Sequence, residues 1–468
     1  MKQFLVFHPF LFAIFPILFL FAYNIDEVPA TDLLLPISVA LIGTLILLLS
    51  LRLITKNYNK IAIIVSFFLA LFFSYGHVRD VIFPPAAKTV VTPNLFLLSL
   101  WALLFVVGAF FIIKSHRNFS ISTKFLNIVA ISLVAISLIN IGIGEIKTIN
   151  LGHEEIGKEG SGLHLSNIGN SPDIYYIILD MYAREDTLKE VLNYDNSEFT
   201  NYLTSRGFYV ATKSCSNYTT SHRSLASSLN MDYLKPEDEG MPRLVEMMRN
   251  SKVSRLLKSV GYRYIFVDGN MGMKGMDKYA EVYLYEGAFG IKVSHFAHSL
   301  CDTTALSPFA RVFSTHGANA ILYAFDALAD IPHIEEPTFV YAHIMCPHSP
   351  GLFDSNGLKK FKIFEPEEFY DDPEGYLGNL AFITKKVKTL MDEILSKSDV
   401  PPVIILQADH GMYGFAKGSQ MWEIFNAYYL PGKDNRLLYE AITPVNSFRV
   451  VFNLYFDTDY ELLKDESK

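Results

Sequence analysis

Two apolar runs in this chain each end in residues that could bind a metal. Residues 173–179 lead into Asp180, and residues 403–406 are followed within four positions by Asp409 and His410. Runs of Val, Ile and Leu are typical of buried parallel strands, and ligands bind beyond the carboxyl ends of such strands. Carboxylate oxygen together with imidazole nitrogen suits Zn²⁺ or Mn²⁺, with Mg²⁺ or Ca²⁺ as alternatives. The pattern predicts a divalent-metal site, unless Asp180 only caps a following helix.

A stretch dense in hydroxyl groups lies between the two runs, at residues 217–230. It reads as the beginning of a helix, where free N–H groups and the helix dipole attract anions. A hydroxyl that binds a metal there can lose its proton and attack phosphorus or sulfur. The same Ser and Thr side chains could instead only cap the helix, because both residue types are favoured at that position.

A further apolar strand, predicted over residues 338–344, is followed by His348 between two prolines. A histidine held in this way can donate to an anionic oxygen or bind a metal. His343 lies inside the predicted strand, where a histidine is more often a core residue whose hydrogen bonds are satisfied. We therefore favour His348 over His343 as the functional histidine.

The first third of the chain is far more apolar than the rest. Of the 468 residues, 50% are hydrophobic and 19% charged, and the charged ones lie mostly after position 150. Five apolar runs of about 20 residues precede that point, each long enough to cross a hydrocarbon core of about 30 Å. They are residues 4–22, 33–53, 61–82, 94–113 and 125–144. We predict an α-helical transmembrane region over residues 1–147, a Gly-rich linker over 148–170 and a separate domain over 171–468.

The charges between these runs predict how the chain is oriented. Basic residues lie before the first run, after the second and between the fourth and fifth, whereas the loop after the first run is acidic. They are Lys2, Arg52, Lys56, Lys60, Lys114, Arg117 and Lys124. Because cytoplasmic loops are enriched in Lys and Arg, an odd number of spans places the C-terminal domain outside the cytosol. A transporter is disfavoured, since the spans contain almost no ionisable residues.

Strands and helices alternate in the C-terminal domain. Strands are predicted at residues 173–179, 208–210, 262–267, 338–344 and 403–406, and helices at 197–206, 244–260 and 376–395. This alternation predicts an α/β domain with a mostly parallel sheet covered on both faces. The net charge of −8 gives no reason to expect nucleic-acid binding.

The chain has three cysteines, Cys215, Cys301 and Cys346, so at most one disulfide can form within it. Their spacing contains no thiolate zinc motif, and sequence does not determine their pairing. If a disulfide forms, Cys215–Cys301 is the pair we expect.

The order of these motifs resembles a known family. Asp180, residues 217–230, the segment Pro347-His348-Ser349-Pro350 and the tripeptide Asp409-His410-Gly411 follow one another as in sulfatase-like members of the alkaline phosphatase superfamily. The five-span anchor with an external domain is similar to the membrane branch that includes lipoteichoic acid synthases and phosphoethanolamine transferases. Residues 217–234 and 443–449 further resemble uncharacterised bacterial membrane proteins that carry a sulfatase domain.

The resemblance implies a metal site and a nucleophile. In that family the metal is held by an acidic residue after the first strand, by the nucleophile and by a late Asp-His pair. The corresponding residues here are Asp180, Ser221, Asp409 and His410. The nucleophile usually precedes a serine by three positions, as Ser221 precedes Ser224, although many membrane relatives have threonine at the nucleophile position.

The resemblance also implies substrate-binding residues. His348 would bind the non-bridging oxygens of the substrate or protonate the leaving group, and Arg223 and Thr220 would contribute to binding. Thr220 is also the second candidate nucleophile. True sulfatases carry a Cys/Ser-x-Pro-x-Arg signature whose first residue becomes formylglycine, and residues 221–225 lack its proline and its arginine spacing. Sulfate-ester hydrolysis by formylglycine is therefore disfavoured.

The function that the resemblance implies is an enzyme of the bacterial cytoplasmic (inner) membrane whose catalytic domain lies on the periplasmic or extracellular side. It would move a phospho-head group from a membrane phospholipid donor to a cell-envelope glycan or lipid acceptor through a covalent serine intermediate. The first alternative is a hydrolase of phosphodiesters or sulfuric esters. The second is a non-catalytic envelope protein with a binding or assembly role.

Overall fold

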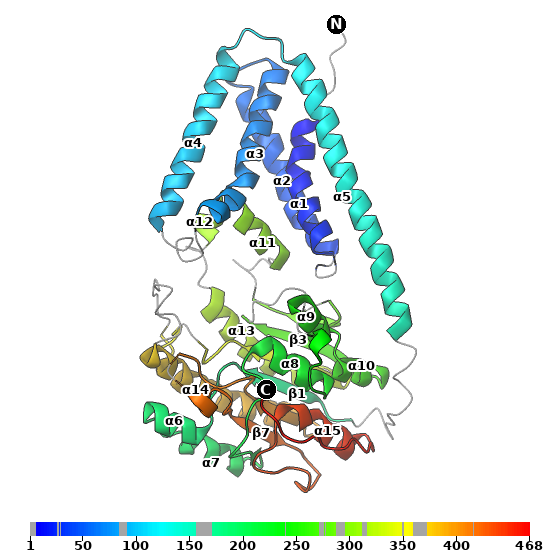
Figure 1. The fold of residues 1–468 in the computed structure, drawn as a ribbon, viewed down its shortest axis with the longest axis vertical. Helices are drawn as coiled ribbons and strands as arrows, with labels where there is room; N and C mark the ends of the chain where they lie inside the picture. The colour runs from blue at the N-terminus through cyan, green and yellow to red at the C-terminus, as the bar shows by residue number, and fades with distance from the viewer. Residues whose placement is uncertain are drawn as a thin grey trace. The chain divides into compact units, whose positions relative to one another are not determined.

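The chain forms two compact units, as the computed structural model in Figure 1 shows. One consists of Met1–Glu155 and Phe289–Ser314, and we call it the helical unit. The other consists of Ile156–Ala288 and Thr315–Lys468, and we call it the sheet unit. The structure describes residues 6–25, 28, 30–83, 91–155, 171–238, 240–270, 276, 278–286, 295–310, 316–348, 351–358, 372–414 and 416–468.

The N-terminal part of the helical unit consists of five apolar helices. They are α1 (His8–Tyr23), α2 (Leu34–Leu51), α3 (Tyr58–Ile82), α4 (Val91–Lys114) and α5 (Ser120–Glu155). Four of them, α2 to α5, contain stretches long and apolar enough to cross a membrane. Helix α1 has 16 residues, which at about 1.5 Å per residue is roughly 24 Å. The predicted helical transmembrane region is confirmed, with a first helix shorter than the other four.

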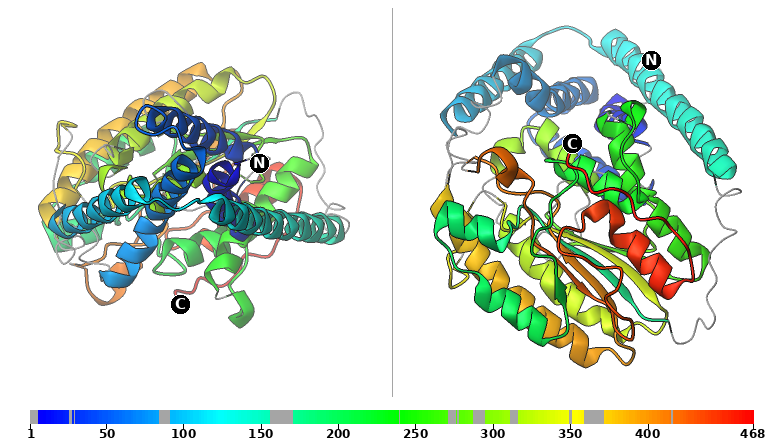
Figure 2. Two further views of the ribbon diagram at one scale, coloured as in Figure 1. Left: turned by 90° about the horizontal axis from the view of Figure 1, so that it is seen from above. Right: turned by 60° about the horizontal axis from the view of Figure 1, so that its bottom comes forward.

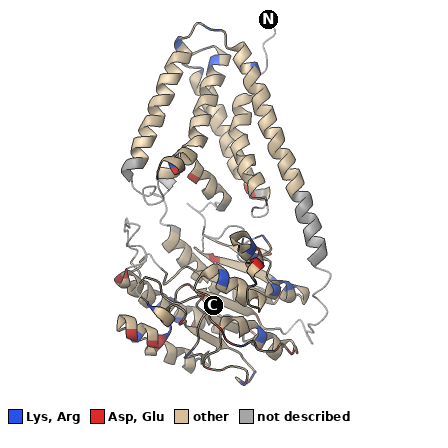
Figure 3. Ribbon diagram, viewed as in Figure 1, with Lys and Arg blue, Asp and Glu red and all other residues tan. Residues whose placement is uncertain are grey.

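Charged residues are scarce along these helices and lie mostly at their ends (Figure 3). The basic residues after α2 and after α4 lie in the short connections to α3 and α5. Arg79 also lies in the last turn of α3, but its side chain is buried. It forms an ion pair with Asp80 at 2.9 Å and donates a hydrogen bond to Ser307.

Two short helices from late in the chain belong to the helical unit. They are α11 (His295–Thr303) and α12 (Ser307–Ala310). Phe296 packs edge-on against Phe21 of α1, with ring centroids 6.2 Å apart. Gly76 of α3 permits a close approach, because a Cβ there would lie 2.5 Å from the carbonyl oxygen of Asp302.

The boundaries that we predicted include this α11–α12 segment in the domain 171–468 and begin a linker at residue 148. Helix α5 continues to Glu155, and residues 156–170 of that linker lie outside the described part of the chain.

A seven-stranded sheet forms the centre of the sheet unit. Its strands are β1 (Ile174–Leu179), β2 (Tyr209–Val210), β3 (Arg263–Gly269), β4 (Val282–Leu284), β5 (Thr338–Ile344), β6 (Val403–Gln407) and β7 (Asn426–Tyr429). They lie in the order β2-β7-β6-β1-β5-β3-β4. The five strands from β6 to β4 are parallel, and β7 is antiparallel to both of its neighbours. The predicted α/β domain with a mostly parallel sheet is confirmed.

Helices cover both faces of this sheet (Figure 2). Because side chains alternate along a strand, Tyr175, Ile177 and Leu179 of β1 lie on one face and Ile174, Tyr176 and Ile178 on the other. The first face packs against α6 (Glu185–Leu192), α7 (Ser197–Ser205), α13 (His316–Asp330) and α14 (Pro373–Lys397). The second packs against α8 (Ser221–Asn230), α9 (Met241–Arg249), α10 (Lys252–Ser259) and α15 (Pro444–Tyr455), and we call it the α8 face.

A row of aromatic rings crosses the sheet on the α8 face. Tyr283, Phe266, Tyr341 and Tyr176 come from β4, β3, β5 and β1, and successive ring centroids lie 5.6, 5.4 and 5.7 Å apart. Phe448 of α15 packs edge-on against Tyr176 at 5.0 Å. Stacked and edge-to-face pairs add to the energy of burial, so this row fixes the four strands and α15 to one another.

The prediction of one helix over residues 244–260 is wrong. The structure has two helices there, α9 ending at Arg249 and α10 beginning at Lys252. Ser251 separates them because its side chain caps α10, accepting a hydrogen bond from the N–H of Ser254 at 3.2 Å. The apolar periodicity continues across this break, so hydrophobicity alone suggested a single helix.

The expected Cys215–Cys301 disulfide is not formed, and all three cysteines are free thiols. Cys215 belongs to the sheet unit, where its backbone forms an isolated antiparallel β-bridge with the backbone of Glu423. Cys301 lies on α11 in the helical unit. Cys346 is buried in the core of the sheet unit.

We predict that Phe448→Ala lowers the free energy of unfolding of the sheet unit by about 3–5 kcal/mol, because it leaves a cavity against Tyr176 and Phe339. Chemical denaturation of the full chain in detergent measures the change. Leu358→Ala is the control, since that side chain is 68% exposed. Equal effects of the two substitutions would contradict the prediction.

Candidate metal centre and active site

Three neighbouring strands carry polar residues at their carboxyl ends. β1 is followed by Asp180, β6 by Asp409 and His410, and β5 has His343 as its last residue but one. His343 is paired in register with Ile178 and lies on the α8 face. Donor atoms of Asp180, His343 and Asp409 all lie within 4.8 Å of one another, and the three residues are buried. The strand order β6-β1-β5 thus brings together groups that are far apart in the sequence.

Each of the two carboxylates is held through one oxygen. Asp180 Oδ2 accepts a hydrogen bond from His343 Nε2 at 3.0 Å. Asp409 Oδ1 accepts from the backbone N–H groups of Met181 at 3.3 Å and His410 at 3.0 Å. The other oxygens, Asp180 Oδ1 and Asp409 Oδ2, are buried without a hydrogen-bond partner among the described residues. Since an unpaired buried carboxylate oxygen is costly, a cation is the partner to expect there.

His410 presents a lone pair to these two free oxygens. Its Nδ1 donates to the carbonyl oxygen of Gly411 at 2.9 Å, which leaves Nε2 unprotonated in the neutral ring. Nε2 lies 3.7 Å from Asp180 Oδ1 and 3.6 Å from Asp409 Oδ2. Gly411 is required in this loop, because a Cβ there would lie 2.6 Å from the carbonyl oxygen of Gln420.

Ser221 supplies a hydroxyl from above the sheet. It is the first residue of α8, and its Oγ lies 3.3 Å from His410 Nε2. Thr220 is the N-cap residue, but its side chain makes no capping hydrogen bond. The first turn of a helix leaves its N–H groups without partners inside the helix and carries a partial positive charge. Ser221 therefore lies where a bound anion would be stabilised.

The four atoms fit a divalent cation. Ligands at about 2.0–2.2 Å from a tetrahedral zinc ion lie roughly 3.4 Å from one another. The distances from His410 Nε2 to Ser221 Oγ, Asp409 Oδ2 and Asp180 Oδ1 are 3.3, 3.6 and 3.7 Å. The donor set of two carboxylates, one imidazole and one hydroxyl could therefore hold one metal ion with little rearrangement.

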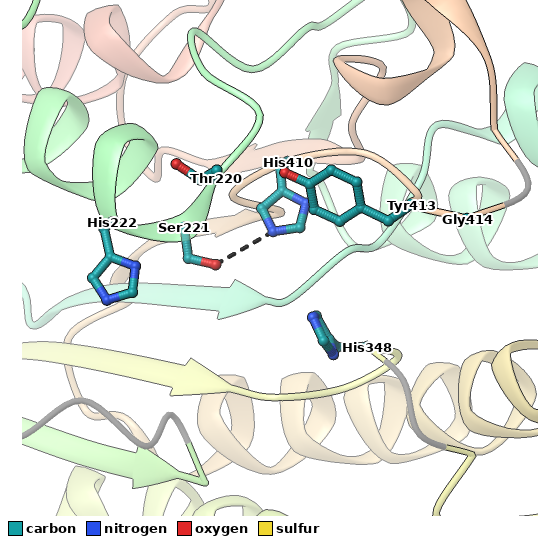
Figure 4. A pocket seen from close by; sticks show the side chains of 7 residues that line it. All are labelled: Thr220, Ser221, His222, His348, His410, Tyr413 and Gly414. Atoms are coloured by element: carbon teal, nitrogen blue, oxygen red, sulfur yellow. Dashed lines mark hydrogen bonds between the residues drawn. The ribbon is translucent and has the colours of Figure 1, made fainter. Parts of the chain in front are cut away.

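A pocket of about 470 Å³ opens beside these atoms (Figure 4). It is lined by Thr220, Ser221, His222, His348, His410, Tyr413 and Gly414. Figure 4 shows Ser221 and His410 together on one side and His348 across the pocket from them. The ring centroids of His348 and His410 are 6.5 Å apart. A small anionic group in the pocket could therefore meet the hydroxyl of Ser221 and the ring of His348 at the same time.

The loop that carries His348 is fixed from both sides. Its backbone N–H donates to the carbonyl oxygen of Asp180 at 3.1 Å. The side-chain amide of Asn379 on α14 donates to the carbonyl oxygens of Pro347 at 3.3 Å and His348 at 3.0 Å. Asn379 is fully buried, so the position of His348 is set by the packing of α14 against the sheet.

Burial and neighbouring charges shift the pKa values in this cluster. Burial alone would raise the pKa of Asp180, but the charges of His348 and His343 and the His343 hydrogen bond bring it below its ordinary value. Burial would lower the pKa of His343, yet its bond to Asp180 and the charges of Asp180 and Asp409 raise it. The pKa of His222 is lowered by burial and by the neighbouring His343. Asp180 is therefore ionised at neutral pH and able to bind a cation.

The structure brings together most of the residues that the sequence predicts for the site. Asp180, Asp409, His410 and Ser221 form one cluster, and His348 and Thr220 line the adjoining pocket. Arg223 is not among the residues that line this pocket. Burial of Tyr218 raises its pKa above the ordinary value, and the charge of Arg223 lowers that pKa by a smaller amount.

Three residues of the site were missed in the sequence. The sequence favours a core role for His343, and it is buried, but its hydrogen-bond partner is the carboxylate of Asp180. Its position in a strand next to the one that precedes Asp180 was the available signal. His222 and Tyr413 also line the pocket, and each lies beside a residue or tripeptide that the sequence had already singled out.

Comparisons with known proteins give matches only among solved structures. No family model and no curated protein matches the chain. The C-terminal periplasmic domain of EcEptC from Escherichia coli matches with a TM-score of 0.44 and 10% identity, over 64% of this chain and 87% of that one. The lipooligosaccharide phosphoethanolamine transferase A (EptA) from Neisseria meningitidis matches with 0.43 and 13%, over 96% and 95%. The lipoteichoic acid synthase LtaP from Listeria monocytogenes matches with 0.40 and 12%, over 61% and 72%.

These structures come from the groups that the sequence motifs resemble. At such TM-scores and identities we take no argument about activity from them.

We predict that His343→Ala weakens zinc binding by roughly 10- to 100-fold, as expected for the loss of a residue that orients a metal-binding carboxylate. His343→Gln, which keeps a donor for Asp180, should lose less. Isothermal titration of the metal-free protein with Zn²⁺ measures the affinity, and His333→Ala, outside the pocket, is the control. Unchanged affinity in His343→Ala would show that Asp180 does not depend on this bond.

Proposed function

We propose that this chain is a membrane-anchored, metal-dependent phosphotransferase. It moves a phospho-head group from a lipid donor to a cell-envelope glycan or lipid through a covalent intermediate on Ser221. The observation that supports this most is the position of Ser221 at the beginning of α8, with Oγ 3.3 Å from His410 Nε2. That nitrogen lies 3.7 and 3.6 Å from two buried carboxylate oxygens that have no hydrogen-bond partner among the described residues. A hydroxyl in that environment is a nucleophile for phosphorus.

Zinc is the metal that the donor set favours. The three distances from His410 Nε2 to the other donor atoms are close to those between ligands of a tetrahedral zinc ion, and His410 supplies an imidazole nitrogen. Mn²⁺ and Mg²⁺ prefer octahedral sites with more oxygen ligands. In this assignment the ligands are Asp180, Asp409, His410 and Ser221. When bound, the metal lowers the pKa of the Ser221 hydroxyl and stabilises negative charge on the phosphoryl oxygens.

The reaction then takes place in two displacements. In the first, deprotonated Ser221 Oγ forms a bond to the donor phosphorus, the bond from phosphorus to the lipid oxygen breaks, and that oxygen takes a proton from His348. In the second, His348 takes the proton of the acceptor hydroxyl as the acceptor oxygen attacks phosphorus and the bond to Ser221 breaks. Both residues return to their starting protonation states.

A membrane lipid is the donor that best suits this architecture. The described part of the chain contains four helices of spanning length and a shorter apolar helix, His8–Tyr23, before the sheet unit. The charge pattern of their connections favours an external sheet unit, in the inner membrane of a bacterium. Such an anchor keeps the active site in the same compartment as lipid head groups and envelope polymers.

We predict that a phosphorus-containing adduct forms on Ser221. The full chain, loaded with Zn²⁺, is incubated with phospholipid or a chromogenic phosphodiester and examined by intact and peptide mass spectrometry. The adduct should map to Ser221, be absent in Ser221→Ala and persist in Thr220→Ala. An adduct on Thr220 would make Thr220 the nucleophile. Absence of adduct, metal binding and turnover with all donors would favour a binding or assembly role.

We also predict that His348→Ala lowers kcat by about 10²- to 10⁴-fold, as for loss of a general acid. Zinc content should not change, because His348 is not among the proposed ligands. A nitrophenyl donor, whose leaving group needs no proton, should lose less in the first displacement than an alkyl donor. Burst kinetics with both donors separate the two displacements. An equal loss for both donors would assign His348 to phosphate binding rather than to proton transfer.

A further inference from the structure

The sequence singles out residues 443–449, Thr-Pro-Val-Asn-Ser-Phe-Arg, and the proposed reaction gives them no role. They form the N-cap and first turns of α15. In the structure this segment contacts the chain on both sides of α8, the helix that begins with Ser221. Residues 443–449 are called the α15 segment.

Before α8, the contact is made through Asn217, four residues ahead of Ser221. Asn217 is fully buried. Its Oδ1 accepts a hydrogen bond from the N–H of Val445 at 2.9 Å, and its Nδ2 donates to Thr443 Oγ1 at 3.0 Å. Val445 lies in the first turn of α15, so Asn217 takes one of the N–H groups that this helix cannot satisfy itself.

Residues 463–468 reinforce this contact. Asp465 Oδ1 accepts hydrogen bonds from the N–H and the hydroxyl of Thr443, at 3.0 and 2.7 Å, and from Asn446 Nδ2 at 3.1 Å. Asn217 donates to the carbonyl oxygen of Glu466 at 2.9 Å, and its own carbonyl oxygen accepts from the N–H of Lys468 at 2.8 Å. The backbone that leads into Ser221 is therefore hydrogen-bonded, through Asn217, to both the α15 segment and residues 463–468.

After α8, the contact is made through Arg449. The helix ends at Asn230 and is followed by its C-cap residue Met231, which has a left-handed conformation with φ 56°. Arg449 donates to the carbonyl oxygen of Met231 through Nε at 2.9 Å and Nη2 at 2.6 Å, and to that of Glu461 through Nη1 at 2.7 Å. A cation at the C-terminus of a helix also interacts favourably with the helix dipole.

The two contacts limit the movement of α8 along its own axis. Both come from one seven-residue segment of α15, and between them Phe448 of the same segment packs on Tyr176 of the sheet. Tyr176 in turn is hydrogen-bonded through its hydroxyl to Ser228 of α8 at 2.9 Å. The helix cannot shift without breaking hydrogen bonds at its ends, so the distance from Ser221 to the sheet-borne ligands is fixed.

We infer that the α15 segment, with Asn217 and Asp465, is a positioning device that holds the nucleophile helix over the metal ligands. That these residues hold α8 in place does not depend on the proposed function. That α8 carries the nucleophile does rest on the proposed function. These residues are positioning residues: Asn217 and Arg449 join the α15 segment to the chain on either side of α8, and Asp465 binds Thr443 and Asn446 of that segment. Their effect on the rate follows because a misplacement of about 1 Å can cost roughly 100-fold.

The test uses full-length protein in detergent with Zn²⁺ and a chromogenic phosphodiester. Asn217→Ala and Arg449→Ala should each lower kcat by roughly 10- to 100-fold with little change in KM. Hydrogen exchange should increase in peptides covering residues 217–231 and stay unchanged in β1 and β6. Asp465→Ala should behave in the same way, whereas Asp465→Asn, which keeps the Oδ1 acceptor, should remain close to wild type. Arg436→Ala, in an exposed ion pair, is the control.

Each outcome decides between defined alternatives. Wild-type exchange and kcat in Asn217→Ala and Arg449→Ala would overturn the inference. Exchange that rises equally in β1 and β6 would also overturn it, because it would show general destabilisation. If the wild-type protein has no turnover but the local increase in exchange occurs, the positioning of α8 holds and the proposed phosphotransferase function fails.

Discussion

Two carboxylates buried side by side are the constraint on which this site depends. Asp180 and Asp409 are 0% and 1% exposed, so water cannot stabilise their charges. The chain supplies partial compensation: His343 binds one oxygen of Asp180, and two backbone N–H groups bind one oxygen of Asp409. One oxygen of each carboxylate remains, and both lie close to the lone pair of His410. A divalent cation between these atoms would compensate both remaining oxygens, which is why we propose a metal centre here rather than a core polar network.

Two parts of the fold make up the site, and their residues are held in position in different ways. The sheet fixes the proposed ligands Asp180, Asp409 and His410, because they follow the adjacent strands β1 and β6. The proposed nucleophile, Ser221, belongs to a helix that lies on the sheet, and helices can slide on an apolar surface more easily than hydrogen-bonded strands can shift register. The chain therefore needs polar contacts at the ends of α8, which apolar packing of that helix does not supply.

Much of the fold could be predicted from the sequence because its signals are local. Apolar runs of about 20 residues indicate spanning helices, and Val/Ile/Leu runs separated by amphipathic stretches indicate a parallel sheet. Tertiary arrangements have no such local signal. The break between α9 and α10 depends on the cap formed by Ser251, inside an uninterrupted apolar period. Likewise, nothing in the composition of α11 shows that it packs against α1, as Phe296 does against Phe21.

The same distinction explains which site residues could be recognised. Asp180, Asp409 and His410 directly follow strands, so their position at the ligand-binding edge follows from the sequence alone. His343 was set aside because a histidine inside a strand has no distinguishing pattern; its role depends on the register that pairs it with Ile178, two residues before Asp180. Asn217 and Arg449 are further from local detection, since they act across 228 and 218 residues of sequence. A residue that binds substrate or metal must be of a type with suitable chemistry, so its identity gives a signal in the sequence. A residue that positions it is defined only by its contacts in the fold, so it can be recognised only from the structure.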